Sequence, residues 1–299
     1  MYSENPRRDT LLFMRASLTN LLALFPFYLR LGNRSGRGRA NERPEDAAAY
    51  FLRCVSDYFA ELAVDASFVR GKRVLEYGPG DTLGVALLLY AHGAETVHSV
   101  DHFPVHRITS QSAAIYRAIL ESLDGEARAR AESAFVEPGN PQSGFDPAKI
   151  EYRVTRHGVS GRRRHYDLVL SRSVLALVDR LDETLADIAA ALRPGGVSIH
   201  KVDLSSHGLD RDRPFDFLTW PDPLYQLMYS RKGRPNRLRV DRYQALAKAA
   251  GLRIRKLAPT GHLSDAEVAF IRPRLDPAFR DVPGELLSWL GFWLVLEPY

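Results

Sequence analysis

Three glycines, at positions 78, 80 and 84, follow the apolar segment Arg73 to Tyr77 and offer the clearest chemistry in the chain. Glycine lets the backbone turn sharply and approach a ligand that a Cβ atom would keep away. We expect a helix to begin near Leu83, with its amide dipoles directed at the same place. The pattern predicts a nucleoside-containing ligand over Gly78 and Gly80. A surface turn, which also collects glycine, is the alternative.

Two acidic residues support the ligand-binding interpretation. Glu76 lies two places before the first glycine, and Asp101 ends a second predicted strand, Thr96 to Val100. A carboxylate at that distance from the glycines can accept hydrogen bonds from both hydroxyls of a ribose. We therefore expect Asp101 to bind the sugar of the ligand.

The elements that must position these residues alternate between strand and helix. Tyr166 to Ser171 is a predicted buried strand, and Val197 to Val202 is another. Between them lies a predicted helix with one apolar face, followed by Leu192-Arg193-Pro194-Gly195-Gly196. This alternation predicts an α/β fold. The apolar face consists of Leu181, Leu185, Ile188, Ala189 and Leu192. A second predicted helix, ahead of the first strand, has an apolar stripe that we expect to lie in the core: Tyr50, Phe51, Cys54, Val55, Tyr58, Phe59 and Leu62.

These motifs resemble those of the class I S-adenosylmethionine (SAM)-dependent methyltransferases, over residues 72–204. The resemblance implies a Rossmann-like, doubly wound sheet of seven strands whose last strand is antiparallel. We expect late strands at 252–257 and 291–297. Residues 1–66 would form an N-terminal helical cap, residues 67–299 the methyltransferase domain, and residues 205–238 an insertion on the substrate side.

The resemblance also implies a cofactor, SAM, and a site for it. Amides of the 78–80 loop would approach the methionine tail, Glu76 and Asp81 its ammonium, and Asp101 the ribose. His102 and Phe103 would flank the adenine, and Tyr77 would lie near the sulfonium. The predicted cofactor-binding residues are Glu76, Tyr77, Gly78, Gly80, Asp81, Asp101, His102, Phe103 and Ser171.

The segment after the fifth strand carries the predicted acceptor site. His207 is the candidate general base, because an imidazole can accept a proton at physiological pH, and Asp203 would orient it. Loop capping is the alternative for both. The His-x-x-Asp-Leu-x-x-His sequence at 200–207, with Asn-Arg-Leu-Arg at 236–239, resembles a bacterial subgroup often associated with glycan or secondary-metabolite pathways. We therefore expect a small-molecule acceptor. The predicted substrate-binding residues are His200, Trp220, Tyr229, Asn236, Arg237 and Arg239.

A metal is not expected at His200, Asp203 and His207, since a His and an Asp three apart on a strand point to opposite faces. Many relatives have Glu-His where this chain has Ala176-Leu177, so no role of that histidine carries over.

Three rival functions use similar features. A nicotinamide oxidoreductase would favour Gly-x-Gly-x-x-Gly, whereas three residues separate Gly80 from Gly84. An amino-base nucleic-acid methyltransferase typically ends its fourth strand in Asn/Asp-Pro-Pro-aromatic, where this chain has Ser171-Arg172-Ser173. A non-catalytic SAM-binding module is the third alternative, and product formation would distinguish it.

Net charge and cysteine content limit the classes of partner and the cellular compartment that we expect. The chain has 299 residues, of which 26% are charged, and a formal net charge of +5. Because the arginines are scattered, we expect a solvated surface and no nucleic-acid partner. Cys54 is the only cysteine, so disulfides are excluded and a cytoplasmic location is expected.

The N-terminal segment 11–29 is a predicted amphipathic helix, bent near Pro26. Its apolar stripe should pack on the catalytic domain or on a second subunit in a homodimer. Attachment to a membrane surface is the alternative, and no segment is long and apolar enough to span a bilayer. The stripe consists of Leu11, Met14, Leu18, Leu21, Leu22, Phe25, Tyr28 and Leu29.

Overall fold

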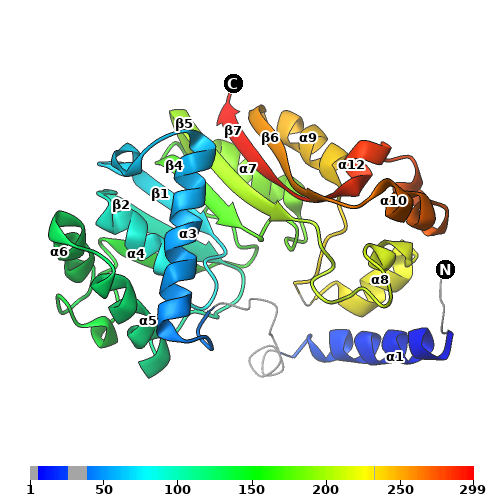
Figure 1. Ribbon diagram of the computed structural model, residues 1–299, viewed down its shortest axis with the longest axis horizontal. Coiled ribbons are helices and arrows are strands. Elements are labelled where there is room, and N and C mark those ends of the chain that lie inside the picture. The colour runs from blue at the N-terminus through cyan, green and yellow to red at the C-terminus, as the bar shows by residue number, and fades with distance from the viewer. Residues whose placement is uncertain (1–5, 26–38, 232) are drawn as a thin grey trace.

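The computed structural model describes residues 6–25, 39–231 and 233–299. Its centre is a seven-stranded sheet in the order β3-β2-β1-β4-β5-β7-β6 (Figure 1). The first five strands in this order are parallel, and β7 is antiparallel to both β5 and β6. This confirms the predicted doubly wound fold. The strands are β1 (Arg73–Tyr77), β2 (Thr96–Asp101), β3 (Ile150–Val154), β4 (Tyr166–Arg172), β5 (Leu192–Asp203), β6 (Leu252–His262) and β7 (Trp289–Pro298).

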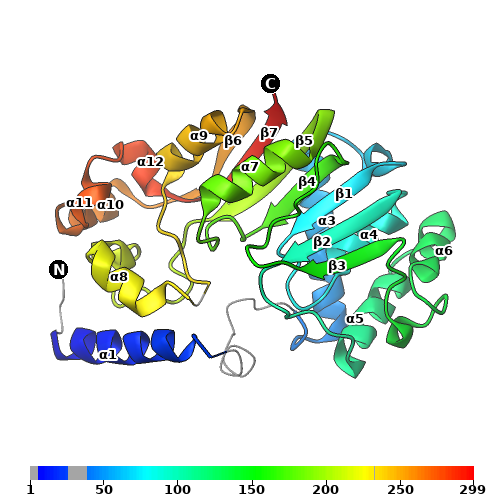
Figure 2. The same ribbon diagram turned by 180° about the vertical axis from the view of Figure 1, so that it is seen from behind.

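Helices cover both faces of the sheet, which is why its central strands are apolar on both sides. Helices α3, α4 and α5 pack on one face, and α7 and α9 lie on the other (Figures 1 and 2). The helices of these two layers are α3 (Pro44–Leu62), α4 (Gly84–Ala91), α5 (Ser110–Glu121), α6 (Gly125–Ser133), α7 (Leu181–Ala191) and α9 (Val240–Ala249). Two short 3₁₀ helices lie in connections: η1 (Ala66–Val69) between α3 and β1, and η2 (Pro141–Ser143) between α6 and β3.

Strand register brings the chemical residues to one edge. Tyr77 lies beside Val100 on β2 and Ser171 on β4, and Ser171 lies beside His200 on β5. The carboxyl ends of β1, β2, β4 and β5 therefore meet at the same edge of the sheet. Ligands of open α/β sheets bind beyond this edge.

Strand β5 is longer than predicted. It begins at Leu192 instead of Val197, and the Pro-Gly-Gly sequence forms an irregularity within it, between the pairs Tyr166–Leu192 and Leu168–Val197. Strand β6 likewise continues to His262, five residues beyond its predicted end.

A third apolar core lies away from the sheet. It joins the predicted insertion, with η3 (Asp216–Thr219) and α8 (Asp222–Tyr229), to a second insertion between β6 and β7 that was not predicted. The second insertion contains α10 (Asp265–Ile271), η4 (Arg272–Arg274), α11 (Pro277–Arg280) and α12 (Gly284–Ser288).

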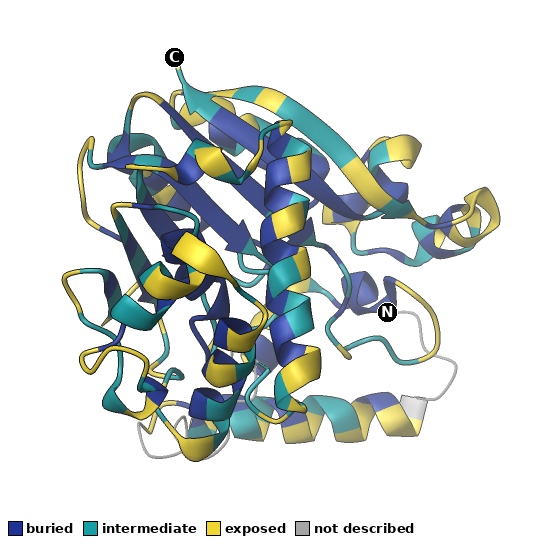
Figure 3. Cartoon of the chain, turned by 60° about the vertical axis from the view of Figure 1, so that its left-hand side comes forward, coloured by how far each residue is buried: buried dark blue, intermediate teal, exposed yellow. Residues whose placement is uncertain are grey.

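The N-terminal helix α1 (Pro6–Leu22) packs against α8 and contributes Ala16 to this third core (Figure 1). Its orientation differs from the prediction, because most of the described part of the apolar stripe points outward and is exposed. Figure 3 shows exposed residues recurring along the helix. The buried residues of this segment are Asp9, Ala16, Asn20 and Ala23. The predicted bend near Pro26, with Tyr28 and Leu29, lies outside the described residues.

Candidate functional site

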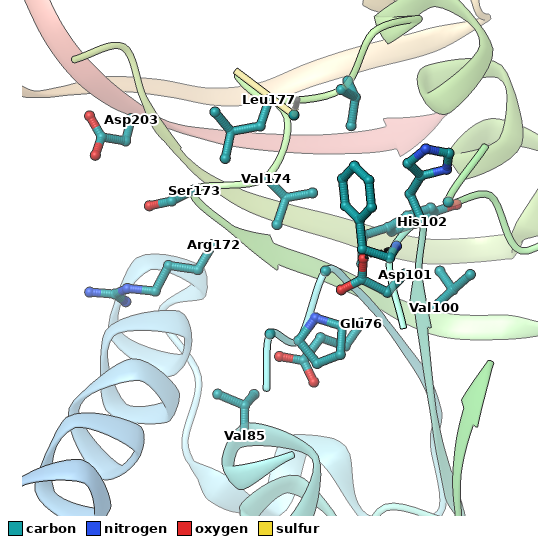
Figure 4. A pocket seen from close by; sticks show the side chains of 18 of the residues that line it. Glu76, Val85, Val100, Asp101, His102, Arg172, Ser173, Val174, Leu177 and Asp203 are labelled. Atoms are coloured by element: carbon teal, nitrogen blue, oxygen red, sulfur yellow. Dashed lines mark hydrogen bonds between the residues drawn. The ribbon is translucent and has the colours of Figure 1, made fainter. Parts of the chain in front are cut away.

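A cavity of about 440 Å³ opens at the carboxyl edge of the parallel strands. This volume falls in the range of small-molecule sites. A charged residue within the last two positions of each of four strands lines the cavity (Figure 4). These residues are Glu76 at the end of β1, Asp101 of β2, Arg172 of β4 and Asp203 of β5.

The glycine loop borders the cavity as predicted. Gly78 and Gly80 have φ angles of 60° and 80°, which favour glycine. A Cβ atom on Gly78 would lie 2.5 Å from Cγ2 of Val174, so the absence of a side chain lets the loop after β4 approach. Gly84 serves a different purpose: its Cβ would lie 2.3 Å from the ring of Phe51, so it allows α3 to pack closely on α4.

Glu76 is a buried acid facing the cavity. Its carboxylate accepts one hydrogen bond among the described residues, from Ser99 Oγ at 3.3 Å. Burial raises the pKa of Glu76 to about 8. A cationic ligand group beside it would favour the ionised form. Of the predicted residues, this one therefore has the electrostatics that suit an ammonium.

Asp101, His102 and Phe103 lie together along the cavity. The Phe103 amide donates to Asp101 Oδ1 at 2.9 Å, and burial raises the pKa of Asp101. The rings of His102 and Phe103 meet edge to face with centroids 4.5 Å apart. The structure thus brings a carboxylate and two aromatic faces to the end of β2, as expected for a nucleoside.

Three predicted cofactor residues point elsewhere. Tyr77 borders the cavity, but its hydroxyl donates to Asp187 on α7, on the other side of the sheet. Asp81 does not line the cavity, and its carboxylate accepts from the amide of Ala40 at 3.3 Å. Ser171 is fully buried, with Oγ 2.8 Å from Nδ1 of His200.

None of the six predicted substrate-binding residues lines the cavity. His200 is buried in the sheet, where desolvation lowers its pKa to about 3. Trp220 and Tyr229 belong to the third core. Aromatic side chains in an insertion can equally form its core or cover a ligand, and here they form the core.

The other three hold backbone segments together. Asn236 Nδ2 donates to Leu175 O at 2.9 Å, and Arg237 Nη1 donates to Trp220 O at 2.6 Å. Arg239 is 1% exposed and donates to three carbonyls, those of Leu204, Leu287 and Trp289. These hydrogen bonds join segments of the fold, and none of the three side chains lines the cavity.

Asp203 and His207 do meet at the cavity. His207 Nε2 lies 3.8 Å from Asp203 Oδ2, and Asp203 Oδ1 accepts from the amide of Ser205 at 2.9 Å. The imidazole Nε2 is buried and has no hydrogen-bond partner among the described residues. His207 has a φ of 51°, a left-handed conformation that is uncommon for a non-glycine residue and worth explaining.

Sequence reasoning missed two groups of lining residues. From α3 come Tyr50, Phe51 and Cys54, whose helical spacing predicted only a core stripe. From the end of β4 and the loop after it come Arg172, Ser173, Val174, Leu177, Val178 and Asp179. Arg172 Nη2 pairs with Asp57 Oδ2 of α3 at 2.8 Å. The sequence offered one indication of the second group. Because β4 was predicted to lie in the same parallel sheet as β1, its carboxyl end had to lie at the same edge as Glu76.

Comparison with known families decides the class of the protein. Residues 45–257 match a family model described as a methyltransferase domain. The chain belongs to this family. It is a SAM-dependent methyltransferase, and SAM is its cofactor. No curated protein matches the chain.

Among solved structures, two similar ones are the following. One is a SAM-dependent methyltransferase from Mesorhizobium loti, with 19% identity, a TM-score of 0.41, and coverage of 76% of this chain and 91% of that one. Another is phosphoethanolamine N-methyltransferase 2 of Haemonchus contortus in complex with SAM, with 16% identity, a TM-score of 0.41, and coverage of 77% of this chain and 49% of that one.

Two absences hold for the part of the chain that the structure describes. No three side chains of His, Cys, Asp or Glu are grouped so that they could hold a metal ion. No helix there has the length and apolarity needed to cross a bilayer.

Proposed function

We propose that the methyltransferase transfers the methyl group to a hydroxyl oxygen of a small acceptor, such as a sugar or a secondary metabolite, with an amine nitrogen as the alternative. The observation that supports this is a cluster of polar side chains in the cavity, separate from those of Glu76 and Asp101. Asp203, Arg172 and Ser173 lie on the side of the cavity away from Glu76 and Asp101 (Figure 4). With His207, which also lines the cavity, they could face an acceptor.

The opposite end of the cavity fits SAM. Glu76 would meet the ammonium, Asp101 the ribose hydroxyls, and His102 and Phe103 the adenine. The buried carboxyl of Glu76, with its pKa near 8, is the kind of group that a bound cation satisfies. When bound, SAM supplies an electrophilic methyl group on its sulfonium.

The chain's own contribution is to position the acceptor and remove its proton. A hydroxyl is a weak nucleophile until its proton leaves, and the unpartnered imidazole of His207 can accept that proton. The Asp203 carboxylate, 3.8 Å away, then stabilises the imidazolium. Positioning supplies much of the remaining acceleration.

We also propose that the methyltransferase domain begins with α3, ahead of the boundary expected at residue 67. Eight side chains of α3 are buried, and many pack with α4 and α5 in one core. On this proposal the N-terminal cap consists of the segment before residue 44.

The test is the turnover of His207→Ala with SAM and a panel of hydroxyl and amine acceptors. We expect kcat to fall by about 10²- to 10⁴-fold with a hydroxyl acceptor, and SAM affinity measured by calorimetry to stay within about twofold. His165→Ala, which changes a histidine outside the cavity, is the control. Full turnover of His207→Ala from pH 6 to 9 would refute the assignment of the base, and an N-methylated product would establish the amine alternative.

A further inference from the structure

Helix α1 presents an apolar face outward, while its inward side carries both polar residues and the apolar Leu12, Phe13 and Ala16, which pack with the third core. On the inward side, Asp9 and Asn20 are each 1% exposed. On the outward side, apolar residues recur at intervals of three and four, as a helical face requires. This apolar face consists of Leu11, Met14, Leu18, Leu21 and Phe25, each at least 55% exposed.

Polar contacts hold the helix in this orientation. Asp9 Oδ2 accepts from Arg211 Nη1 at 2.7 Å, and the Arg211 side chain is only 4% exposed. Asn20 Nδ2 donates to Leu227 O at 3.0 Å, and its Oδ1 accepts from the amide of Arg231 at 3.0 Å. Rolling the helix over would break these buried hydrogen bonds, which is costly. The apolar face is therefore presented in the free protein.

Exposed apolar side chains are concentrated at this place. Among the described residues ten large hydrophobic side chains are exposed, and five of them form the apolar face. Two more, Leu24 and Leu227, lie in the turn after α1 and on the helix α8 that it contacts. The remaining three are Val136, Val154 and Tyr299. A patch of this kind marks an interaction surface.

The charge of the chain is concentrated in the same segment. Residues 1–40 contain seven arginines and two acidic residues, so they carry the whole formal net charge of +5, while the other residues sum to zero. Of these arginines, Arg7 and Arg15 are exposed on α1, and each is four residues, about one helical turn, from Leu11.

We propose that α1 binds the surface of a bilayer that contains anionic phospholipid. The apolar face would enter the boundary between headgroups and acyl chains, and Arg7 and Arg15 would meet the phosphates. The helix, about 25 Å long from its 17 residues, would lie in the plane of the membrane. A second copy fits this surface less well, because it carries the same positive charge on the same segment.

The test is cosedimentation of the full chain with vesicles of phosphatidylcholine, with and without about one third phosphatidylglycerol. We expect binding to the anionic vesicles that weakens at high salt. Leu11→Ser/Leu18→Ser should weaken binding at least about tenfold, and Arg7→Gln/Arg15→Gln by a similar factor. Val136→Ser/Val154→Ser, which replaces two exposed apolar side chains outside α1, should bind as the wild type does. SAM affinity should be unchanged in all three variants, because the cavity contains no residue of α1.

Three results would overturn the proposal. One is equal affinity, or none, for the two kinds of vesicle. Another is undiminished vesicle binding by Leu11→Ser/Leu18→Ser. The third is a concentration-dependent dimer in sedimentation that this substitution dissociates while vesicles are not bound, which would identify a second copy as the occupant.

Discussion

Glu76 shares the wall of the cavity with Asp101, yet each acid has a different task in our proposal. Burial beside a single hydroxyl donor keeps Glu76 largely protonated at neutral pH in the free protein, since its pKa is about 8. An ammonium at this place favours the carboxylate, so ligand binding and proton release are linked.

We therefore predict that SAM binding is accompanied by proton release at pH 7, and that affinity increases from pH 6 to 7.5 as Glu76 ionises more readily. Titration calorimetry in buffers of different ionisation enthalpy measures the proton directly. Glu76→Gln should bind more weakly and show no dependence on the buffer. A wild type that is insensitive to the buffer would remove Glu76 from the ammonium site.

A second prediction compares the effects of two aspartates on SAM affinity: Asp101 at the end of β2, and Asp81, which follows Gly80. Asp101→Ala should weaken SAM binding by roughly 10- to 150-fold, because it removes charge-assisted hydrogen bonds worth about 1.5–3 kcal/mol. Asp81→Ala should change SAM affinity by less than about threefold, since its carboxylate lies outside the cavity beside Ala40. Calorimetry that ranks the two variants in the reverse order would contradict this assignment.

At this scale, most of the residues predicted to bind the cofactor line the cavity, and none of those predicted to bind the substrate does. Glu76, Gly78 and Asp101 end strands or form a tight turn, where local geometry fixes direction. Arg237 and Arg239 looked like anion ligands, but their guanidinium groups bind carbonyls of segments distant in sequence. Only the tertiary structure decides which acceptor such a long side chain meets.

At the scale of elements, the contact between α3 and α4 is set by Gly84. We predict that Gly84→Ala pushes the helices apart, because the new Cβ would lie 2.3 Å from the Phe51 ring. The free energy of unfolding should fall by about 1–3 kcal/mol. SAM affinity should fall as well, since Phe51 and Val85 both line the cavity. Denaturant unfolding and calorimetry measure the two effects.

Gly261→Ala is the control for this variant, because its Cβ would meet only Leu290, at 3.6 Å. Phe51→Leu combined with Gly84→Ala should recover part of the lost stability. If Gly84→Ala is as stable as the wild type, the close approach of the helices is not required.

Helix periodicity predicts which side of a helix is apolar, but it does not predict whether that side is buried. It identified the apolar sides of both α1 and α3 from sequence, and α3 buries its side in the core. It did not say whether the apolar side of α1 is covered within the chain. Buried contacts of Asp9 and Asn20 determined that orientation, and neither residue belongs to an apolar pattern.

For the whole molecule, truncation tests where the catalytic domain begins. Deleting residues 1–24 should leave a cooperatively folding chain whose SAM affinity is within about threefold, because α1 contacts α8 and not the sheet. Deleting residues 1–66 should prevent folding, since it removes eight buried side chains of α3. Burial of an apolar side chain contributes about 1.5–3 kcal/mol, and domains are stable by only about 5–15 kcal/mol. Circular dichroism and SAM binding of both forms provide the measurement, and a folded 67–299 fragment would restore the original boundary.

The order of strands β5-β7-β6 also determines when the sheet can be completed during synthesis. Strand β6 leaves the ribosome before β7, yet β7 lies between β6 and the rest of the sheet. At about 5–20 residues per second, roughly two to seven seconds pass before residues 263–298 are made and β6 gains its partner. An unpaired strand invites association with other nascent chains, and charge and proline discourage it. Arg253, Arg255, Lys256 and Pro259 lie in β6. These residues would disfavour pairing of the exposed β6 with other chains before β7 is made. In the folded protein β6 is an edge strand, and the same residues would disfavour edge-to-edge association there.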